Sequence, residues 1–381
     1  MMDISYILNI LGEDREQYSN AVAPPIFQTS NFAFKTVADF RLATKNELIS
    51  HLYTRGNNPT TEIVRKKIAA LEGTDDCLLF SSGVAAISAT IFHCVKAGDH
   101  IICIESPYSW TEYLLKNILP GYGITSTFVD GKNTEEITKA IQPNTKLIFL
   151  ESPNTFWFDL QDLKAICDIA RSKNIITAID NSYCTPLYQQ SHLLGVDIIC
   201  HTATKYLSGH SDVLAGVICA NQEHINSIFK NEYMTYGAVL SPNDAWLFLR
   251  GLRTLPLRLE KSVSNAEKLI SWLEKHPKIE KIIYPFHNSH PQFELAKKQM
   301  KRGGGLFAVL LKTQDKQKIE SFCDNLKRFL LAVSWGGYES LVFPACIKEG
   351  GTYPVNFVRF YTGLEEVEVL IEDIEQALEG V

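Results

Sequence analysis

The residue whose position most clearly suggests chemistry is Lys205, which stands shortly after an apolar run at 196–200. Thr204 and Thr202 lie one and three residues before it, and a Gly-His-Ser-Asp turn follows at 209–212. An amine at a strand end, flanked by hydroxyls, suits a Schiff base with an aldehyde cofactor whose phosphate the hydroxyls would hold. The alternative is a solvated surface lysine, because charged side chains are mostly exposed.

A second anion-binding element is predicted at the turn 81–84, whose sequence is Ser-Ser-Gly-Val. It stands between a short apolar run at 77–80 and a helical pattern at 84–96. Such a turn aims backbone N–H groups and the positive end of a helix at an anion. Gly83 and Val84 are therefore candidates for the same phosphate, although a plain strand–helix turn is the alternative. Ligands in open α/β sheets collect at the carboxyl ends of the strands, where both elements are expected.

Two further strand ends present side chains that suit an aromatic cofactor. Asp180 closes an apolar run at 175–179, where its carboxylate could pair with a protonated pyridine nitrogen and keep the ring an electron sink. An aspartate in this position is also a common cap or turn residue. Tyr108 follows the apolar run at 101–104 and could stack on a ring, although surface tyrosines are common.

Two arginines are candidates for anion binding. Arg55 lies in a loop with Tyr53, where its guanidinium and the tyrosine hydroxyl could bind a phosphate; the alternative is a solvated loop arginine. Arg359 stands inside an apolar strand-like run at 357–360. A buried arginine needs an anionic partner, which is either a substrate carboxylate or an internal acidic residue.

The elements that must position these residues alternate along the chain. Helical patterns, such as the one at 160–173, separate near-continuous apolar runs. These runs occur at 101–104, 127–129, 147–150, 175–179, 198–200 and 217–219. Buried apolar strands alternating with helices predict an α/β fold with a mostly parallel sheet covered on both faces.

The pattern changes after residue 250 to that of a smaller α+β domain. Helices are predicted at 257–276 and 367–378, with strands at 306–311, 341–343 and 357–360. The first 55 residues are irregular and polar, which suits an extended arm. We therefore predict an arm at 1–55, a cofactor-binding α/β domain at 56–250 and a C-terminal α+β domain at 251–381.

Composition limits the function classes. The chain has 381 residues, of which 45% are hydrophobic and 21% charged, as expected for a globular protein with two large domains. Its net charge of −6 and the lack of a basic stripe argue against nucleic acid or an anionic membrane as partner. The first residues show no signal-peptide pattern, and no apolar run approaches the roughly 20 residues of a membrane span.

The nine cysteines are scattered, odd in number and without a Cys-x-x-Cys pair. Several of them lie in apolar runs. This distribution predicts buried free thiols in a reducing cytoplasm and no structural zinc site.

Taken together and in order, these motifs resemble those of the transsulfuration group of pyridoxal-phosphate enzymes. The resemblance runs from the segment Pro-Pro-Ile-Phe-Gln-Thr-Ser at 24–30 to Gly-Leu-Glu at 363–365 and so covers nearly the whole chain. It implies the type I fold of these enzymes, which is similar to aspartate aminotransferase, with pyridoxal 5'-phosphate as cofactor and a small amino acid as substrate. It also implies a homo-oligomer whose arm crosses between subunits, as a tetramer built from two dimers.

The resemblance also implies individual roles. Lys205 would form the Schiff base and serve as catalytic base, Asp180 would pair with the pyridine nitrogen, and Tyr108 would stack on the ring. The remaining implied roles are phosphate binding by Gly83, Val84, Thr202 and Thr204, completed by Tyr53 and Arg55 of a neighbouring subunit, and binding of the substrate carboxylate by Ser334 and Arg359. One departure is Asn154, which stands one place earlier than the asparagine of the usual Ser-Asn-Pro.

Which reaction the chain catalyses is less sharply marked. The segment 332–341, Ala-Val-Ser-Trp-Gly-Gly-Tyr-Glu-Ser-Leu, resembles bacterial cystathionine β-lyases, in which tryptophan follows the serine. Val333 is closer to methionine γ-lyases, and Phe-Pro-Ala at 343–345 also favours the γ-acting group. We predict a cytoplasmic carbon–sulfur lyase of methionine biosynthesis that forms homocysteine, pyruvate and ammonia from cystathionine. The alternatives are γ-elimination, γ-replacement on an acylated homoserine, and a cofactor-bound regulator of a partner protein.

Overall fold

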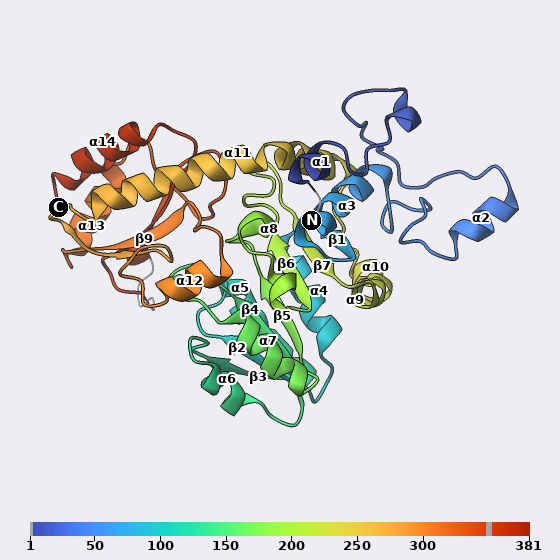
Figure 1. The fold of residues 1–381 in the computed structure, drawn as a ribbon, viewed down its shortest axis with the longest axis horizontal. Helices are drawn as coiled ribbons and strands as arrows, with labels where there is room; N and C mark the ends of the chain where they lie inside the picture. The colour runs from blue at the N-terminus through green and yellow to red at the C-terminus, as the bar shows by residue number, and fades with distance from the viewer. Residues whose placement is uncertain (1–2, 348–352) are drawn as a thin grey trace.

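The computed structural model describes residues 3–347 and 353–381, and its two sheets are connected by the long helix α11, Pro242–Leu273 (Figure 1). The helix begins where the Ser241 hydroxyl accepts a hydrogen bond from the Asp244 amide at 3.0 Å, with Pro242 in its first turn. The sequence pattern predicted a start at 257. The structure extends the helix N-terminally through Pro256, although proline disfavours helix interiors.

The larger sheet has seven strands in the order β1-β7-β6-β5-β4-β2-β3. Only β7 runs against its neighbours, so the sheet is mostly parallel, as predicted. Its strands are β1 Asp76–Phe80, β2 His100–Ile104, β3 Thr125–Val129, β4 Thr145–Glu151, β5 Ile176–Asp180, β6 Ile198–Thr202 and β7 Gly216–Ala220.

Helices cover both faces of this sheet because its central strands present apolar side chains to both faces. In β2, Ile102 and Ile104 join one buried cluster, whereas Ile101 and Cys103 join another. Successive side chains of a strand point to opposite faces, so a continuous apolar run supplies two cores. The first cluster includes residues of α3 Pro59–Glu72, α7 Leu163–Ser172 and α11; the second includes residues of α4 Gly83–Cys94 and α9 Gln222–Ile228.

The carboxyl ends of the central strands meet at one edge of the large sheet. Glu151 at the end of β4 is the register partner of Asp180 at the end of β5, and Asp180 is paired with Cys200 of β6. Gly216 of β7 is paired with both Phe80 of β1 and Thr202 of β6. Residues from four distant parts of the chain are thereby placed side by side.

The smaller sheet has five strands in the order β10-β11-β12-β9-β8. Its core is a separate cluster that includes Phe307, Phe322 and Phe360. The strands are β8 Ile279–Ile283, β9 Leu306–Leu311, β10 Leu330–Leu331, β11 Leu341–Pro344 and β12 Phe357–Tyr361, and the helices beside them are α12 Phe293–Gln299, α13 Lys316–Asn325 and α14 Val367–Leu378. This is the smaller C-terminal α+β unit that the sequence predicted.

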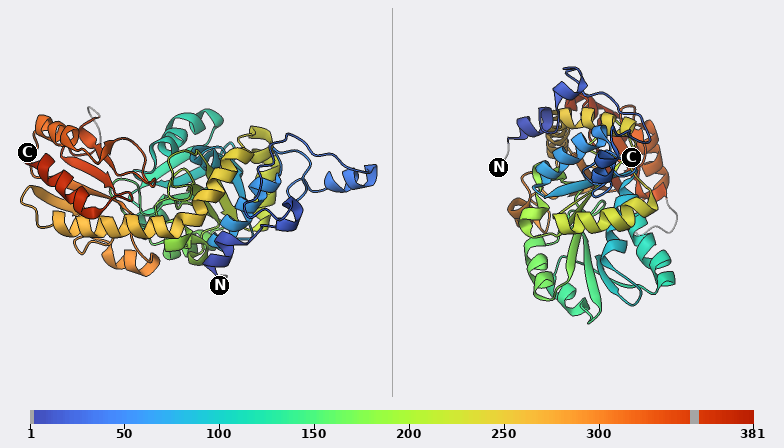
Figure 2. Two further views of the ribbon diagram at one scale, coloured as in Figure 1. Left: turned by 90° about the horizontal axis from the view of Figure 1, so that it is seen from above. Right: turned by 90° about the vertical axis from the view of Figure 1, so that its right-hand side faces the viewer.

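The N-terminal segment combines a docked part with a projecting part. Helix α1, Ile4–Asn9, packs on α3 and α11, with Ile7 and Leu8 buried. Helix α2, Val37–Ala43, lies at the far end of the molecule, away from both sheets (Figure 2). Val37 and Leu42 on this projection are 71% and 68% exposed, so apolar surface is left uncovered in the single chain. The shorter remaining helices are α5 Ser109–Tyr113, α6 Thr134–Ala140, α8 Thr185–Tyr188 and α10 Met234–Tyr236.

Three observations concern the cysteines, the apolar helices and possible metal sites. All nine cysteines are free thiols and buried, which confirms that prediction. Among the described residues, no helix combines the length and apolarity needed to cross a membrane. The same part of the chain holds no cluster of three or more potential metal-binding side chains.

Candidate active site

Lys205 lies in the turn that follows β6, with its side chain directed toward the small domain. Its amide donates to the Thr202 carbonyl at 3.1 Å, and its Nζ donates to the Ser334 hydroxyl. The ammonium also lies 5.5 Å from the centre of the Trp335 ring. Burial, together with the positive charge of Arg359, lowers the pKa of Lys205 to about 8, against the opposing effect of Asp180. An amine with this pKa is partly uncharged near neutral pH and can act as nucleophile or base.

Asp180 is a buried carboxylate held by the residues around it. Its Oδ1 accepts hydrogen bonds from the Ser182 amide at 3.0 Å and from the Ser182 hydroxyl. The Ser182 hydroxyl in turn accepts from the Thr202 amide at 2.6 Å, which connects the ends of β5 and β6. Burial raises the pKa of Asp180, whereas the Ser182 bonds, His201 and Lys205 lower it. A cation brought to this carboxylate therefore meets a fixed, desolvated partner.

Tyr108 is positioned by a second buried carboxylate, that of Glu151. The Tyr108 amide donates to Glu151 Oε2 at 2.7 Å, and the Thr155 hydroxyl donates to Oε1 at 2.6 Å. Burial and the neighbouring Asp180 raise the pKa of Glu151 to about 8. Tyr108 itself is half-buried, and its pKa is raised by burial, by Asp180 and by Glu151. The structure thus brings Tyr108 close to Asp180, as their predicted roles require.

The turn before α4 forms a tight cradle against β6. The Ser82 hydroxyl accepts from the Ala85 amide at 3.1 Å. The first N–H groups of a helix have no intrahelical partner, which leaves the Gly83 and Val84 amides for a ligand. A Cβ on Gly83 would lie 2.1 Å from Thr202 Oγ1, so glycine is required for this approach. The Thr202 hydroxyl and the helix end therefore meet at one point, as the sequence predicted.

Thr204 is already engaged within the turn. Its hydroxyl donates to the Ala215 carbonyl at 3.3 Å and accepts from the Ala215 amide at 3.1 Å. A hydroxyl has one proton, so Thr204 cannot donate to a phosphate while it makes this bond. Its phosphate-binding role stays a prediction.

Arg359 and Ser334 form the opposite wall of the site. Arg359 is 5% exposed and lies in β12, and it has no ion pair with an acidic residue in the part of the chain that the structure describes. Its guanidinium lies instead 4.7 Å from the centre of the Phe156 ring and 5.3 Å from that of Phe343. Burial lowers the pKa of Arg359 to about 10. A buried cation that has no acidic partner among the described residues is suited to a carboxylate from a ligand.

Ser334 reaches Lys205 from a strained backbone position. Its φ is +80°, a region that residues other than glycine rarely adopt and that often occurs at functional sites. Gly336 follows with a φ of +88°, and a Cβ there would lie 2.6 Å from the Tyr206 amide. The loop after β10 therefore packs closely on the turn that carries Lys205.

Tyr53 and Arg55 lie on the N-terminal segment and are both exposed. The Arg55 guanidinium lies 5.4 Å from the centre of the Tyr53 ring. No contact joins either residue to Lys205 or Asp180 within the described parts of the single chain. Their assignment to a neighbouring subunit stays a prediction.

Three side chains that contribute to the site were not predicted: Ser182, Glu151 and Phe156. A sequence signal existed for the first two, since Glu151 directly follows the apolar run at 147–150 and Ser182 follows Asp180 by two residues. Phe156 carries none, because its contact with Arg359 spans more than 200 residues. Asn154 is buried, and its Oδ1 has no hydrogen-bond partner among the described residues.

Together these side chains fit pyridoxal 5'-phosphate. The observation that tests the fit is the close approach of Gly83 to Thr202. A Cβ at residue 83 would clash with the Thr202 side chain, whereas glycine leaves two helix-end amides for a phosphate. Lys205 supplies a partly buried amine of lowered pKa for the aldehyde, and Asp180 supplies a buried carboxylate for the ring nitrogen. Tyr108 follows β2, and its amide is held by Glu151, the register partner of Asp180.

A family model for "Cys/Met metabolism PLP-dependent enzyme" matches residues 8–379. The chain belongs to this family. Pyridoxal 5'-phosphate is therefore its cofactor, and the type I fold follows from the same match together with a close structural relative. That relative, the crystal structure of metB from Corynebacterium glutamicum, has a TM-score of 0.93 and 32% sequence identity, covering 100% of this chain and 98% of the other.

The similar curated proteins carry several reaction names. An L-methionine gamma-lyase of Fusobacterium nucleatum subsp. nucleatum is 39% identical over 94% of both chains. A cystathionine beta-lyase of Lactococcus lactis subsp. cremoris is 36% identical over 97% of both chains, and a cystathionine gamma-lyase of Bacillus subtilis is 35% identical over 96% of both. Such similar identities establish family membership and leave the bond that is cleaved to be determined.

Proposed function

We propose that the chain is a carbon–sulfur lyase that cleaves cystathionine by β-elimination to homocysteine, pyruvate and ammonia. The observation that supports lyase chemistry is the position of Lys205, a partly buried amine of lowered pKa that contacts Ser334 and feels the charge of Arg359, a cation without an acidic partner among the described residues. Arg359 would bind the α-carboxylate of an amino acid and thereby direct its Cα–H bond toward Lys205 Nζ. The amine would then remove that proton as general base.

The other residues support this proton transfer. When bound, pyridoxal 5'-phosphate supplies an electron sink for the electron pair left at Cα. Asp180 would hold a proton on the ring nitrogen, and Tyr108 would cover the ring face. Trp335, which is 6% exposed and 5.3 Å from the Tyr206 ring, would exclude water from the region around Lys205 Nζ.

We rank β-elimination ahead of γ-elimination because the serine–tryptophan pair at 334–335 resembles that of bacterial β-lyases. β-Elimination also needs only the one deprotonation at Cα. γ-Elimination from methionine is the second candidate. It is favoured by Val333 and by the 39% identity to an L-methionine gamma-lyase, and it requires a second deprotonation at Cβ, which Lys205 could also perform.

Product analysis of the purified holoenzyme separates the candidates. With cystathionine, pyruvate and homocysteine mean β-elimination, whereas 2-oxobutyrate and cysteine mean γ-elimination. With methionine, 2-oxobutyrate and methanethiol identify the second candidate. Bound cofactor without turnover of either thioether would refute both and favour a regulatory protein.

We also propose that Tyr53 and Arg55 complete the phosphate site of a second copy of the chain. The support is their exposure on a segment that projects from the body and carries uncovered apolar residues (Figure 2). Arg55→Ala and Lys205→Ala subunits, each inactive alone, should partly restore activity when reassembled together, because one site of the hybrid then holds both residues. No recovery in verified hybrids would assign the segment to its own subunit.

A further inference from the structure

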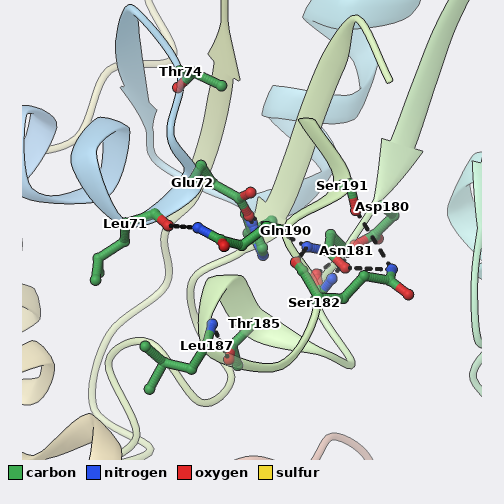
Figure 3. Close-up of polar contacts among 12 residues, drawn as sticks. Leu71, Glu72, Thr74, Asp180, Asn181, Ser182, Thr185, Leu187, Gln190 and Ser191 are labelled. Atoms are coloured by element: carbon green, nitrogen blue, oxygen red, sulfur yellow. Dashed lines mark hydrogen bonds and ion pairs between the residues drawn. The ribbon is translucent and has the colours of Figure 1, made fainter. Parts of the chain in front are cut away.

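Behind the strand ends that carry Asp180 and Thr202 lies a buried carboxylate that the reaction described above does not use. Glu72 is the last residue of α3 and is fully buried. Figure 3 shows its side chain directed toward Asn181 and the loop after β5. A charge in such a place is stabilised only by close partners.

One oxygen of this carboxylate joins two strands. Glu72 Oε1 accepts from His201 Nε2 in β6 and from Asn181 Nδ2, at 3.3 Å, directly after β5. His201 precedes Thr202 in the cradle, and Asn181 follows Asp180. Each partner of Glu72 is thus one residue from a predicted cofactor contact, on the opposite face of its strand.

The Asn181 amide is fixed on its remaining sides. Its Nδ2 donates to the Gln189 carbonyl at 2.9 Å, and its Oδ1 accepts from Gln189 Nε2 at 2.9 Å. The Asn181 backbone amide continues the sheet by donating to the Cys200 carbonyl at 2.8 Å. A shift of the backbone at Asp180 and Asn181 would break these bonds, so the network fixes the strand end from which the Asp180 carboxylate projects.

Three polar atoms of the network have no hydrogen-bond partner among the described residues: Glu72 Oε2, His201 Nδ1 and Gln189 Oε1. All three residues are at least 99% buried. Apolar side chains could fill the same space without leaving polar atoms unpaired. The unpaired atoms therefore point to a role other than stability, and His201 lies close enough to Asp180 to lower its pKa.

We propose that Glu72, acting with His201 and Asn181, is a positioning residue that fixes the Asp180 carboxylate against the ring nitrogen of pyridoxal 5'-phosphate. The inference rests on the cofactor and not on which thioether is cleaved. It predicts that loss of the Glu72 charge loosens the cofactor and slows turnover without changing substrate binding, since Glu72 does not reach the Arg359 wall.

The test compares holoenzymes of wild type, Glu72→Gln, His201→Asn and Glu13→Gln. The last is a matched control, because the Glu13 side chain is also buried and pairs at 3.1 Å with Lys67, which lies in α3 like Glu72 but away from the strand ends. Release of cofactor after dilution is followed by visible absorbance, together with Tm, kcat and KM. Glu72→Gln should release cofactor about tenfold faster and lose about tenfold in kcat with KM unchanged, a change of about 1.4 kcal/mol.

His201→Asn should show the same pattern. The double variant should be no worse than Glu72→Gln, because both changes remove one interaction. Glu13→Gln should lower Tm alone. The proposal is refuted if Glu72→Gln lowers Tm but retains the cofactor as Glu13→Gln does. If Glu72→Gln does not fold, cofactor release from His201→Asn decides between the same outcomes. Cofactor release is scored even if neither thioether is a substrate, so failure of the proposed function leaves this test intact.

Discussion

The site has two walls: a cofactor wall at the strand ends of the large sheet, and a substrate wall around Arg359 in the small domain. The two walls differ in how their charged groups are paired. At the strand ends of the large sheet, Asp180 and Glu151 accept hydrogen bonds from Ser182, Tyr108 and Thr155 of the same domain. In the small domain, Arg359 has no acidic partner among the described residues, and its guanidinium lies near the rings of Phe156 and Phe343. A wall with satisfied charges suits a cofactor that stays bound. A wall with an unsatisfied cation suits a substrate that must enter and leave, because binding then supplies the missing anion.

The largest effect is expected at Lys205, whose Nζ contacts Ser334 and so connects the two walls. Lys205→Ala should abolish elimination and the absorbance of lysine-bound cofactor, because both the covalent anchor and the base are lost. Borohydride reduction followed by mass spectrometry should find no cofactor on the peptide that contains residue 205. The surface variant Lys261→Ala is the control and should behave as wild type. A reduced cofactor label on Lys205 in wild type identifies this residue, even if another lysine is labelled in the variant. A label found only on a different lysine in wild type would reject the assignment.

On the cofactor wall, Asp180→Asn should keep the fold but lower kcat. A charge-assisted hydrogen bond is worth about 1.5–3 kcal/mol, so the loss should be roughly tenfold to a few hundredfold. KM should change little. Asp197→Asn is a matched control at the amino end of the neighbouring strand, where Asp197 accepts from the Thr177 amide at 2.8 Å. Unchanged turnover in Asp180→Asn would remove this residue from the mechanism.

Where a residue and its signal are local, the sequence could predict which residues meet at the strand ends of the large sheet, while their roles stay predictions. Lys205, Asp180 and Gly83 each stand at the end of an apolar run, and parallel strands bring such ends together. Glu72 and Phe156 could not be predicted in this way. A glutamate at a helix end is usually exposed, and its burial depends on His201, 129 residues away.

The small domain and α11 show a related limit. The strands at 306–311 and 357–360 were predicted from apolar runs, yet nothing local indicates that Phe156 of the large domain packs on Arg359. Likewise the start of α11 at Pro242 depends on the Ser241 cap, which the apolar pattern alone did not weigh against the interior Pro256. Long-range contacts and caps therefore account for the residues that were missed.

On the substrate wall, Arg359→Lys should raise KM by about tenfold, since lysine keeps the charge but cannot reproduce the two-pronged contact, worth about 1.4 kcal/mol here. The visible spectrum should remain that of wild type, because the cofactor wall is unaltered. Arg65→Lys is a buried control, since Arg65 already has an acidic partner, Asp76, at 3.0 Å. A normal KM in Arg359→Lys would assign the carboxylate to another residue.

The smallest effect concerns the electrostatic influence of one wall on the other. Burial and, next, the charge of Arg359 lower the pKa of Lys205 to about 8. Only the uncharged amine attacks an aldehyde, so the rate at which cofactor-free protein takes up pyridoxal 5'-phosphate should rise with pH, with a midpoint near this value. Arg359→Met removes the neighbouring cation, which raises the pKa of Lys205 and moves the midpoint upward. Burial still acts, so the shift is partial, and the rate at pH 7 should fall severalfold. Stopped-flow absorbance across pH measures this shift, with Arg302→Met as a distant control. An unchanged midpoint would show that the charge of Arg359 is neutralised before substrate arrives, which would contradict the contrast between the two walls.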